Sequence, residues 1–405
     1  MARRGRGQAR VSPMRRLTGT IQPYAWGSTT TIPELLGVEP TGEPQAELWL
    51  GAHPLHPSTV DGAPLTELIA AEPKRVIGAA SVDRYGPRLP YLMKVLAAAQ
   101  PLSLQAHPSR AQAEAGYERE QLLDVPRDAP YRNYRDGWPK PEVLCALEPT
   151  EALCGFREPK ETYDLFARLG VVSALRLIEP LRDGTDDVLA VVFRRLLQLG
   201  RTTFVQTVVD DVVEAAQGNV DPELADFTAT AVEVARFYPG DPGVLAALMM
   251  NRIEFGPYDA IYLPPGDLHA YLSGGGIEIM ANSDNVLRGG LTPKHIDIDE
   301  LIAVLEFTPS SPTPIPVVEE APGVFGYQAP AEEFALWRIA QSGVPGSLPG
   351  SRSGRVVLVV EGSTRLQTPA GTLSLRRGES AFVYADEDVT YVGDGMLFVG
   401  GPGLR

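Results

Sequence analysis

The chain has 405 residues, of which 44% are hydrophobic and 21% charged, and its formal net charge is −15. This length predicts two or three domains, and the lack of an apolar run of 18 or more residues excludes a membrane-spanning helix. The negative charge argues against nucleic acid and membrane surfaces as partners, so any site for an anionic ligand must be built from a few local cations.

The N-terminal region combines a basic start with a β-rich continuation. The first 16 residues contain six arginines but no apolar segment, so they are not a secretory signal peptide. Residues 1–16 are expected to be a disordered basic tail, or to follow an upstream start codon with the true start at Met14. From residue 17 to 156, short apolar runs between Pro and Gly indicate strands, such as 46–51, 89–96 and 143–147. Helices are expected at 65–71 and 109–120.

The pattern changes to helices between residues 157 and 255. Thr185-Asp186 and Thr202 are placed to cap two helices, and Asp221-Pro222 and Asp241-Pro242 to open two more. A capping residue, a Pro in the first turn and a Gly after the end are the usual punctuation of helices. This stretch predicts an inserted helical domain without a catalytic motif of its own.

Strands are expected again from residue 256, with one helix at 297–307 and a Pro-rich connector at 309–322. The final β region contains strand-like runs at 355–360, 364–367, 380–384 and 396–399, separated by Gly turns. Such a succession of short strands is typical of a β-sandwich or jelly roll. The triple glycine at 274–276 predicts a flexible turn, because it lacks the strand-to-helix context of a nucleotide-binding loop.

A first candidate metal motif lies between residues 102 and 108. If this segment is a strand, Ser103, Gln105 and His107 share one face, because side chains alternate along a strand. The Gln105 amide oxygen and a nitrogen of His107 can then reach one metal ion. A single His in a strand is nevertheless more often a hydrogen-bonded core residue than a ligand.

Two further motifs supply possible ligands for the same metal. A Pro-Gly turn delivers His269 into a new strand, where Tyr271 shares its face. In Pro139-Lys140-Pro141-Glu142, the prolines hold an extended backbone, and Glu142 opens an apolar strand where a carboxylate needs a partner. Together with the first motif, these residues form a mixed nitrogen and oxygen set that suits Zn²⁺ with one position open.

A group of polar and basic residues follows His269. The Asn-Ser-Asp-Asn cluster at 282–285 is dense in hydrogen-bonding groups, although it also fits a β-turn. Arg288 and Lys294 bracket a Gly-Gly turn and can bind a phosphate or an enediolate. The chain has 31 arginines but five lysines, and Lys94, Lys140 and Lys294 lie beside these motifs. Lysine can transfer protons where arginine cannot, so these lysines are candidates for chemistry.

In these motifs the chain resembles the type I phosphomannose isomerases. The similarity covers most of the chain and is carried by residues 23–28, 47–54, 92–96, 102–108, 140–142, 269–271 and, most specifically, 282–293. The resemblance implies a mainly β fold with two cupin-like (jelly-roll) domains and an inserted α-helical domain. We accordingly expect a catalytic cupin-like domain over 17–156 and 256–308, the helical domain over 157–255, and a C-terminal cupin-like domain over 323–405.

The resemblance also implies a reaction and a set of site residues. The reaction is the interconversion of D-mannose 6-phosphate and D-fructose 6-phosphate by zinc-assisted proton transfer through an enediol(ate), which feeds GDP-mannose synthesis. One Zn²⁺ per chain would be held by Gln105, His107, Glu142 and His269. The expected catalytic residues are Arg288, Lys140 and Asp284. The expected substrate-binding residues are Ser103, Lys94, Lys294, Tyr271, Trp26 and His53.

Several points stay open at the level of sequence. The base can be Lys140, Lys94, Asp284 or a metal-bound water. The partner is expected to be a small sugar phosphate, and the protein is expected to be a monomer. A cytoplasmic location is expected because the two cysteines give no disulfide framework.

The chain departs from the family pattern at one place beside the site. Trp138-Pro139 stands where the family usually has Asn-His. This departure keeps a non-catalytic sugar-binding bicupin as one alternative. A metal-dependent cupin oxygenase is a separate alternative. An oxygenase of this kind usually shows His-x-His, whereas this chain has Gln105 at the first position.

Overall fold

The computed structural model describes residues 14–184, 187–310 and 312–404. The described chain divides into two compact units. The first unit comprises residues 14–23, 29–95 and 316–404, and the second comprises residues 24–28 and 96–315. Strand β6 (Tyr91–Ala98) crosses the boundary between them. These two units differ from the three predicted domains, whose boundaries stay a prediction.

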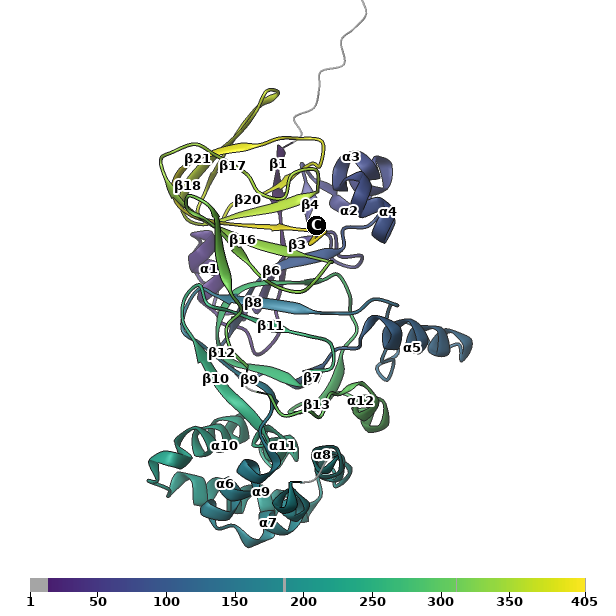
Figure 1. The fold of residues 1–405 in the computed structure, drawn as a ribbon, viewed down its shortest axis with the longest axis vertical. Helices are drawn as coiled ribbons and strands as arrows, with labels where there is room; N and C mark the ends of the chain where they lie inside the picture. Colours follow the sequence, from purple (N-terminus) through teal and green to yellow (C-terminus); the bar gives the residue numbers. More distant parts are fainter. Residues whose placement is uncertain (1–13, 185–186, 311, 405) are drawn as a thin grey trace, which may run out of the picture. The chain divides into compact units, whose positions relative to one another are not determined.

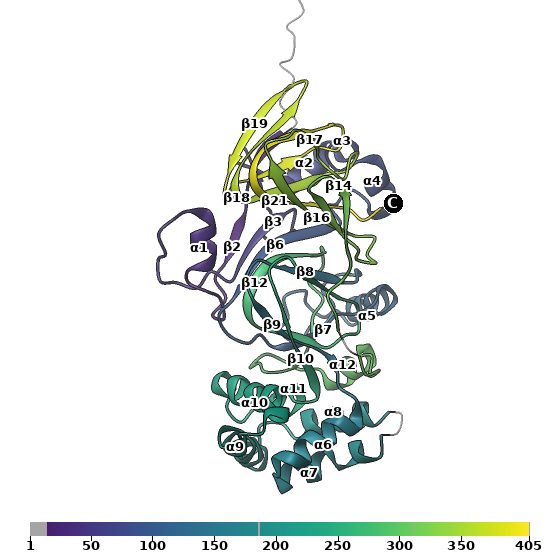
Figure 2. The ribbon, with the colours of Figure 1, turned by 60° about the vertical axis from the view of Figure 1, so that its left-hand side comes forward.

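The first unit contains most of the β-structure of the chain (Figures 1 and 2). Its strands are β1 (Met14–Thr18), β2 (Thr20–Gln22), β3 (Glu47–Gly51), β4 (Thr59–Val60), β5 (Ala63–Pro64), β14 (Val317–Ala321), β15 (Val324–Tyr327), β16 (Ala335–Ser342), β17 (Gly346–Ser347), β18 (Arg355–Thr368), β19 (Gly371–Arg376), β20 (Ser380–Val383) and β21 (Thr390–Gly401). Its helices are α1 (Thr31–Leu36), α2 (Leu65–Ala71), α3 (Pro73–Ile77) and α4 (Ala79–Tyr85).

An antiparallel sheet organises this unit in the order β14-β15-β16-β21-β18-β20-β1-β4-β5, with β17 beside β21 and β19 beside β18. The N-terminal strand β1 pairs with β20, so that Met14 lies opposite Val383. Met14 is buried in the core of the sheet, and Arg15 forms an ion pair with Asp61. The prediction of a disordered tail is therefore wrong for Met14–Arg16, and its remaining part lies outside the described residues.

The second unit combines a smaller set of strands with most of the helices. Its strands are β7 (Leu104–Ala106), β8 (Glu142–Ala146), β9 (Thr150–Phe156), β10 (Met250–Phe255), β11 (Ala260–Leu263), β12 (His269–Ala281) and β13 (Leu287–Gly290). Its helices are α5 (Arg110–Leu122), α6 (Pro159–Leu169), α7 (Val172–Ile178), η1 (Glu179–Asp183), α8 (Val188–Gln198), α9 (Thr203–Gln217), η2 (Pro222–Leu224), α10 (Ala225–Phe237), α11 (Gly243–Ala247) and α12 (Ile298–Val304).

Strand β12 connects the sheet of the second unit. It pairs with β7 and β9 near its start and with β8 near its end, always antiparallel. Gly274–Gly276 lie inside this strand, so the prediction of a flexible turn is wrong. A Cβ atom on any of the three would collide with a main-chain oxygen of a neighbouring segment, namely Pro149, Leu96 and Cys145 respectively. The glycines are needed for close approach of the backbones rather than for flexibility.

Helices α6–α11 lie between β9 and β10, where an insertion was predicted, and both ribbon views show them gathered beside β10. The prediction of helix is wrong for residues 250–255, which form strand β10. Their apolar faces form a core in which Phe166 packs edge-on against Phe227. Thr202 accepts a hydrogen bond from the amide of Val205, which confirms it as a cap. The cap expected at Thr185-Asp186 lies outside the described residues. Two antiparallel sheets with a helical insertion confirm the predicted fold class.

No helix in the described part of the chain is both long enough and apolar enough to cross a membrane.

Candidate active site

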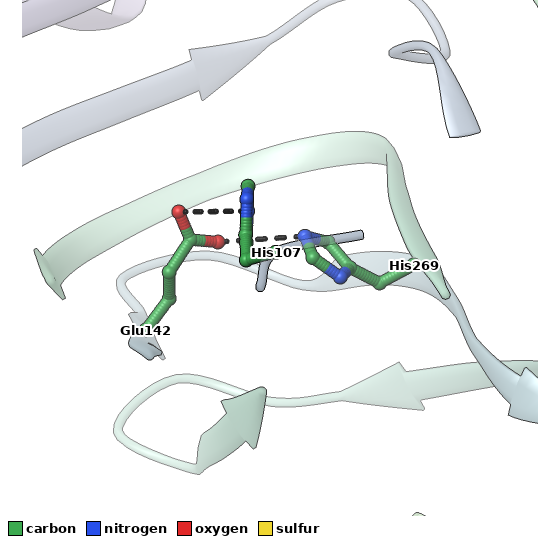
Figure 3. A group of neighbouring side chains, drawn as sticks. All are labelled: His107, Glu142 and His269. Atoms are coloured by element: carbon green, nitrogen blue, oxygen red, sulfur yellow. Dashed lines mark ion pairs between the residues drawn. The ribbon is translucent and has the colours of Figure 1, made fainter. Parts of the chain in front are cut away.

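Three of the four predicted metal ligands converge in the second unit. Glu142 is the first residue of β8, His269 is the first residue of β12, and His107 follows directly after β7. One potential ligand atom from each lies within 4.8 Å of the other two. All three residues are buried, each with 1% of its surface exposed. Figure 3 shows both imidazole rings directed toward the two carboxylate oxygens of Glu142.

The hydrogen bonds behind the two rings decide which nitrogen carries the proton. Nδ1 of His107 lies 2.8 Å from the main-chain oxygen of Asn285, and Nδ1 of His269 lies 3.0 Å from that of Asp267. A carbonyl oxygen only accepts, so Nδ1–H is the donor in both rings. Nε2, which in a neutral ring then carries the lone pair, faces Glu142 in both residues, at 3.3 Å from His107 and 3.4 Å from His269. This is how metal-binding histidines are usually oriented.

Charge is distributed so that these ligands are in the form that binds a metal. Burial and the Lys140 ammonium lower the pKa of His107 to about 4, which keeps its ring neutral. Burial alone would raise the pKa of Glu142, but the Lys140 ammonium outweighs it and holds that pKa well below its usual range. Lys140 Nζ lies 2.8 Å from Glu142 Oε1 and 3.5 Å from His107 Nε2. The Glu142 carboxylate is therefore ionised next to the neutral imidazole of His107.

This arrangement fits a cation better than it fits hydrogen bonding. Among the described residues, Glu142 Oε2 and His269 Nε2 are buried without a hydrogen-bond partner. Buried polar atoms rarely lack partners, because their desolvation is then uncompensated. Two nitrogen donors and a carboxylate are a ligand set that zinc accepts readily. The group can therefore hold one metal ion.

The sheet register also brings Gln105 and Arg288 to this region. Gln105 in β7 lies directly opposite His269 of β12 on one side and opposite Arg288 of β13 on the other. Residues opposite each other in antiparallel strands point their side chains to the same face. Gln105 thus shares a sheet face with the candidate ligand His269 and with the predicted catalytic arginine. The strand itself is shorter than predicted, and Ser103 and His107 lie just outside it.

A cluster of basic groups accompanies Arg288. Burial and the nearby Arg135 guanidinium lower the pKa of the half-buried Arg288. Partial burial, Arg288 and Arg135 likewise lower the pKa of Lys294. Three cations that repel one another in a chain of net charge −15 favour an anionic ligand between them.

Hydrogen bonds connect the segment 135–138 to the Asn-Ser-Asp-Asn cluster. The amide of the half-buried Asp284 donates to Asp136 Oδ2 at 3.0 Å. The Ser283 hydroxyl donates to Asp136 Oδ1 at 2.8 Å. The ring of Trp138, part of the unusual Trp-Pro pair, lies 3.9 Å from the guanidinium carbon of Arg110. The cluster at 282–285 is therefore more than a local turn, because it makes tertiary contacts with the segment 135–138.

Two aromatic candidates also belong to the second unit. The buried Tyr271 hydroxyl lies 3.4 Å from Glu278 Oε1, and the Tyr271 and His269 ring centroids are 6.5 Å apart. Burial and the carboxylates of Glu278 and Glu142 raise the pKa of Tyr271 well above its usual value. Trp26 is half-buried and packs against the apolar cluster that contains Tyr271.

The remaining candidates, Lys94 and His53, belong to the first unit. Lys94 Nζ lies 3.3 Å from Glu47 Oε1, and Trp49 Nε1 donates to Glu47 Oε2 at 2.7 Å. His53 is buried, and its ring meets Trp49 edge-on at 4.6 Å between centroids. These residues form a buried polar group of their own unit. Their roles toward a substrate stay a prediction.

Sequence reasoning missed Arg135, Asp136 and Glu278. Arginine carries little signal in this chain, because 31 of its 36 basic residues are arginines. Asp136 precedes the Trp-Pro pair in a loop, where an acidic residue is normally solvated. Glu278 follows the glycine run at 274–276, for which the sequence predicts a turn. A strand assignment there would have suggested that this charged residue needs a partner.

Known proteins resemble this chain over nearly its full length. A family model described as the catalytic domain of type I phosphomannose isomerase matches residues 14–159. Mannose-6-phosphate isomerase of Escherichia coli (strain K12) is 36% identical over 395 residues, covering 95% of this chain and 98% of that protein. The human protein of that name is 31% identical and covers 92% and 94% respectively.

Solved structures agree with the sequence comparisons. The crystal structure of mannose 6-phosphate isomerase from Salmonella typhimurium, bound to substrate (fructose 6-phosphate) and zinc, superposes with a TM-score of 0.88 at 34% identity. The match covers 97% of this chain and 100% of that one. A zinc-bound holo form of mannose 6-phosphate isomerase gives the same TM-score. These similarities confirm the family resemblance found in the motifs, and the chain belongs to the mannose-6-phosphate isomerase family.

Proposed function

We propose that this protein is a zinc-dependent aldose–ketose isomerase that interconverts D-mannose 6-phosphate and D-fructose 6-phosphate. The observation that carries the proposal is the convergence of two bare imidazole nitrogens on the buried carboxylate of Glu142. Family membership makes the sugar phosphate the matching substrate, because a relative of this chain binds it.

We infer that His107, Glu142 and His269 hold the zinc ion, with Gln105 as a fourth ligand supported by its register opposite His269. The ion would polarise the substrate oxygens at C1 and C2 and so acidify the neighbouring C–H bond. The Lys140 ammonium balances the charge of Glu142 and is placed to donate a hydrogen bond to a substrate oxygen.

The isomerisation moves one carbon-bound proton and one hydroxyl proton, and it needs no redox partner. The base removes the proton from C2 of mannose 6-phosphate, and the same proton equivalent is returned to C1, while a hydroxyl proton passes from O2 to O1. Lys140 and Asp284 of the second unit remain side-chain candidates for the base, and Lys94 stays a prediction from the sequence. Arg288 is proposed to stabilise the negative charge that develops on the enediolate oxygens.

The basic cluster is proposed to bind the phosphate group. Arg135, Arg288 and Lys294 supply local positive charge in a chain whose net charge is −15. Partial desolvation of such groups strengthens their attraction for a dianion. Ser103, Tyr271 and Trp26, which all belong to the second unit, are proposed to line the sugar pocket. The role of His53 stays a prediction from the sequence.

The decisive experiment is a coupled assay with purified protein. Mannose 6-phosphate is supplied, and fructose 6-phosphate is detected through conversion to glucose 6-phosphate and its oxidation. We expect turnover that disappears after chelation and returns when zinc is added.

Matched histidine variants identify the site. His107→Ala is expected to lose both zinc and turnover, whereas the exposed His56→Ala should keep both. Absence of turnover in zinc-loaded protein would contradict the isomerase proposal for this substrate.

Fractionation of cells tests the expected cytoplasmic location, and light scattering of the purified protein tests the expected monomeric state.

A further inference from the structure

Asn285 bonds to two regions that are distant in sequence. It is completely buried, with 0% of its surface exposed. Its main-chain oxygen accepts the hydrogen bond from His107 Nδ1 at 2.8 Å. Its side-chain oxygen accepts from the amides of Arg135 at 2.7 Å and Asp136 at 3.2 Å. Its side-chain nitrogen donates to the carbonyls of Asp136 at 2.7 Å and Trp138 at 2.9 Å.

Neighbouring residues add further hydrogen bonds between the segment 283–285 and the segment 135–138. The Ser283 hydroxyl donates to Asp136 Oδ1, and its oxygen lies 3.3 Å from the Asn285 amide nitrogen. Asp136 Oδ1 also accepts from the amide of Trp138 at 2.9 Å. A local β-turn would need none of the contacts to Asp136, because Asn285 and Asp136 are 149 residues apart in the chain. The amide of Asn285 thus fixes the segment 135–138 on which Arg135 lies.

We propose that Asn285 is a positioning residue that holds the His107 ring in its metal-binding orientation and ties the Arg135 loop to the metal site. Its carbonyl oxygen can keep the proton on Nδ1 of His107 only while the Asn285 backbone stays in place. The side-chain amide holds that backbone by bonding to the main chain of the 135–138 loop. The inference rests on the proposed metal role of His107, but not on the identity of the sugar substrate.

Asn285→Ala tests this role through zinc affinity and without an activity assay. Zinc is titrated into the metal-free protein in competition with a chromophoric chelator. We expect about 10- to 100-fold weaker binding, the usual effect of disturbing the outer hydrogen bonds of a metal ligand. Gln341→Ala is the matched control, because this amide also donates to two main-chain carbonyls and accepts one bond, but lies in the first unit. Its zinc affinity should equal that of the wild type.

A second readout separates positioning from general loosening of the fold. In the metal-free wild-type protein at neutral pH, ¹⁵N shifts of the His107 ring should show protonated Nδ1 and unprotonated Nε2. We expect Asn285→Ala to give a mixture of tautomers at His107 and no change at His269, whose Nδ1 bonds to Asp267 instead.

The proposal stands only if zinc affinity and the His107 tautomer both change. If either stays at its wild-type value, or if His269 changes equally, Asn285 has no specific positioning role. If Asn285→Ala does not fold, Ser283→Ala decides by the same criteria with a smaller expected loss, since it removes one hydroxyl. Absent sugar turnover together with the expected shifts would refute the isomerase function but leave this inference intact.

Discussion

Arg355 in the first unit and Glu142 in the second are both buried charged residues, yet their surroundings are opposite. The Arg355 guanidinium donates to the main-chain oxygens of Leu348, Pro349 and Glu387. Glu142 instead lies 2.8 Å from the Lys140 ammonium and faces the Nε2 atoms of His107 and His269. Main-chain carbonyls thus satisfy the two terminal nitrogens of Arg355, although its Nε has no hydrogen-bond partner among the described residues. Around Glu142, by contrast, the carboxylate and the two imidazole nitrogens converge on a common point, as expected of a metal site.

Tyr91 resembles Arg355, because its buried polar group also bonds to the main chain of the first unit. Its hydroxyl accepts from the amide of Val356 at 3.1 Å and lies 2.9 Å from the carbonyl oxygen of Gly400 and 3.0 Å from that of Gly354. Each of these three partners is main chain of the first unit. Arg355 and Tyr91 should therefore affect stability, and the Glu142 group should affect activity.

The largest effect is expected for Glu142→Gln. The amide keeps the volume of the side chain but removes the negative charge that attracts the metal. We expect kcat/KM to fall by about 10³-fold or more, equivalent to about 4 kcal/mol, with zinc binding weakened in parallel. Circular dichroism should show an unchanged fold. An active zinc-loaded variant would contradict the proposed ligand role.

Arg288→Ala should come next. Loss of a cation that stabilises developing negative charge typically lowers kcat by about 10²- to 10³-fold. Zinc affinity should remain near the wild-type value, because Arg288 is not a proposed ligand. Arg288→Lys is expected to recover part of the rate. Equal activities of the alanine variant and the wild type would remove Arg288 from the mechanism.

Arg355→Met is expected to act on stability alone. It leaves three main-chain carbonyls without their donor, which should lower the free energy of unfolding by about 2–4 kcal/mol. Denaturant unfolding measures this loss, and the coupled assay should give an unchanged kcat/KM for the folded protein. If the variant had normal stability but impaired catalysis, Arg355 would have a role in activity and not in stability, contrary to this prediction.

Tyr91→Phe gives the smallest effect and a pH signature. Burial raises the pKa of Tyr91 well above its usual value, so the folded protein retains a proton that the unfolded chain loses above about pH 10. This stabilisation is present below about pH 10 and is lost as pH rises, by up to about 1.4 kcal/mol per pH unit. The variant should lose about 1 kcal/mol at neutral pH. A stability difference that does not narrow above about pH 10 would argue against this linkage.

The sequence was informative where local chemistry specifies structure. Thr202 caps a helix as expected, and Asp297 caps the helix that was predicted to begin there, because their side chains satisfy amides within the same turn. The pairing of β1 with β20 could not be predicted, since it joins the N-terminal and C-terminal regions of the chain, with Met14 opposite Val383. Long-range pairing of this kind has no local signature.

In the candidate site, too, local features could be predicted from the sequence and long-range contacts could not. His107, Glu142 and His269 were recognisable, because an ionisable side chain at the edge of an apolar strand needs a specific partner. The contribution of Asn285 and the segment 135–138 could not be predicted, because Asn285 resembles a turn residue until its partners at 135–138 are known. Nothing in the sequence indicates which nitrogen of His107 faces the metal, because a main-chain carbonyl decides it.

The three consecutive glycines of β12 make part of this molecule unusually intolerant of mutation. Residues 274–276 carry no reactive group, yet any side chain there would push the strand away from its neighbours. The same strand begins with His269 and pairs near its end with Glu142, so such a displacement would separate two groups that must meet. A random mutagenesis screen for lost activity should therefore recover substitutions at inert positions as often as at the ligands themselves.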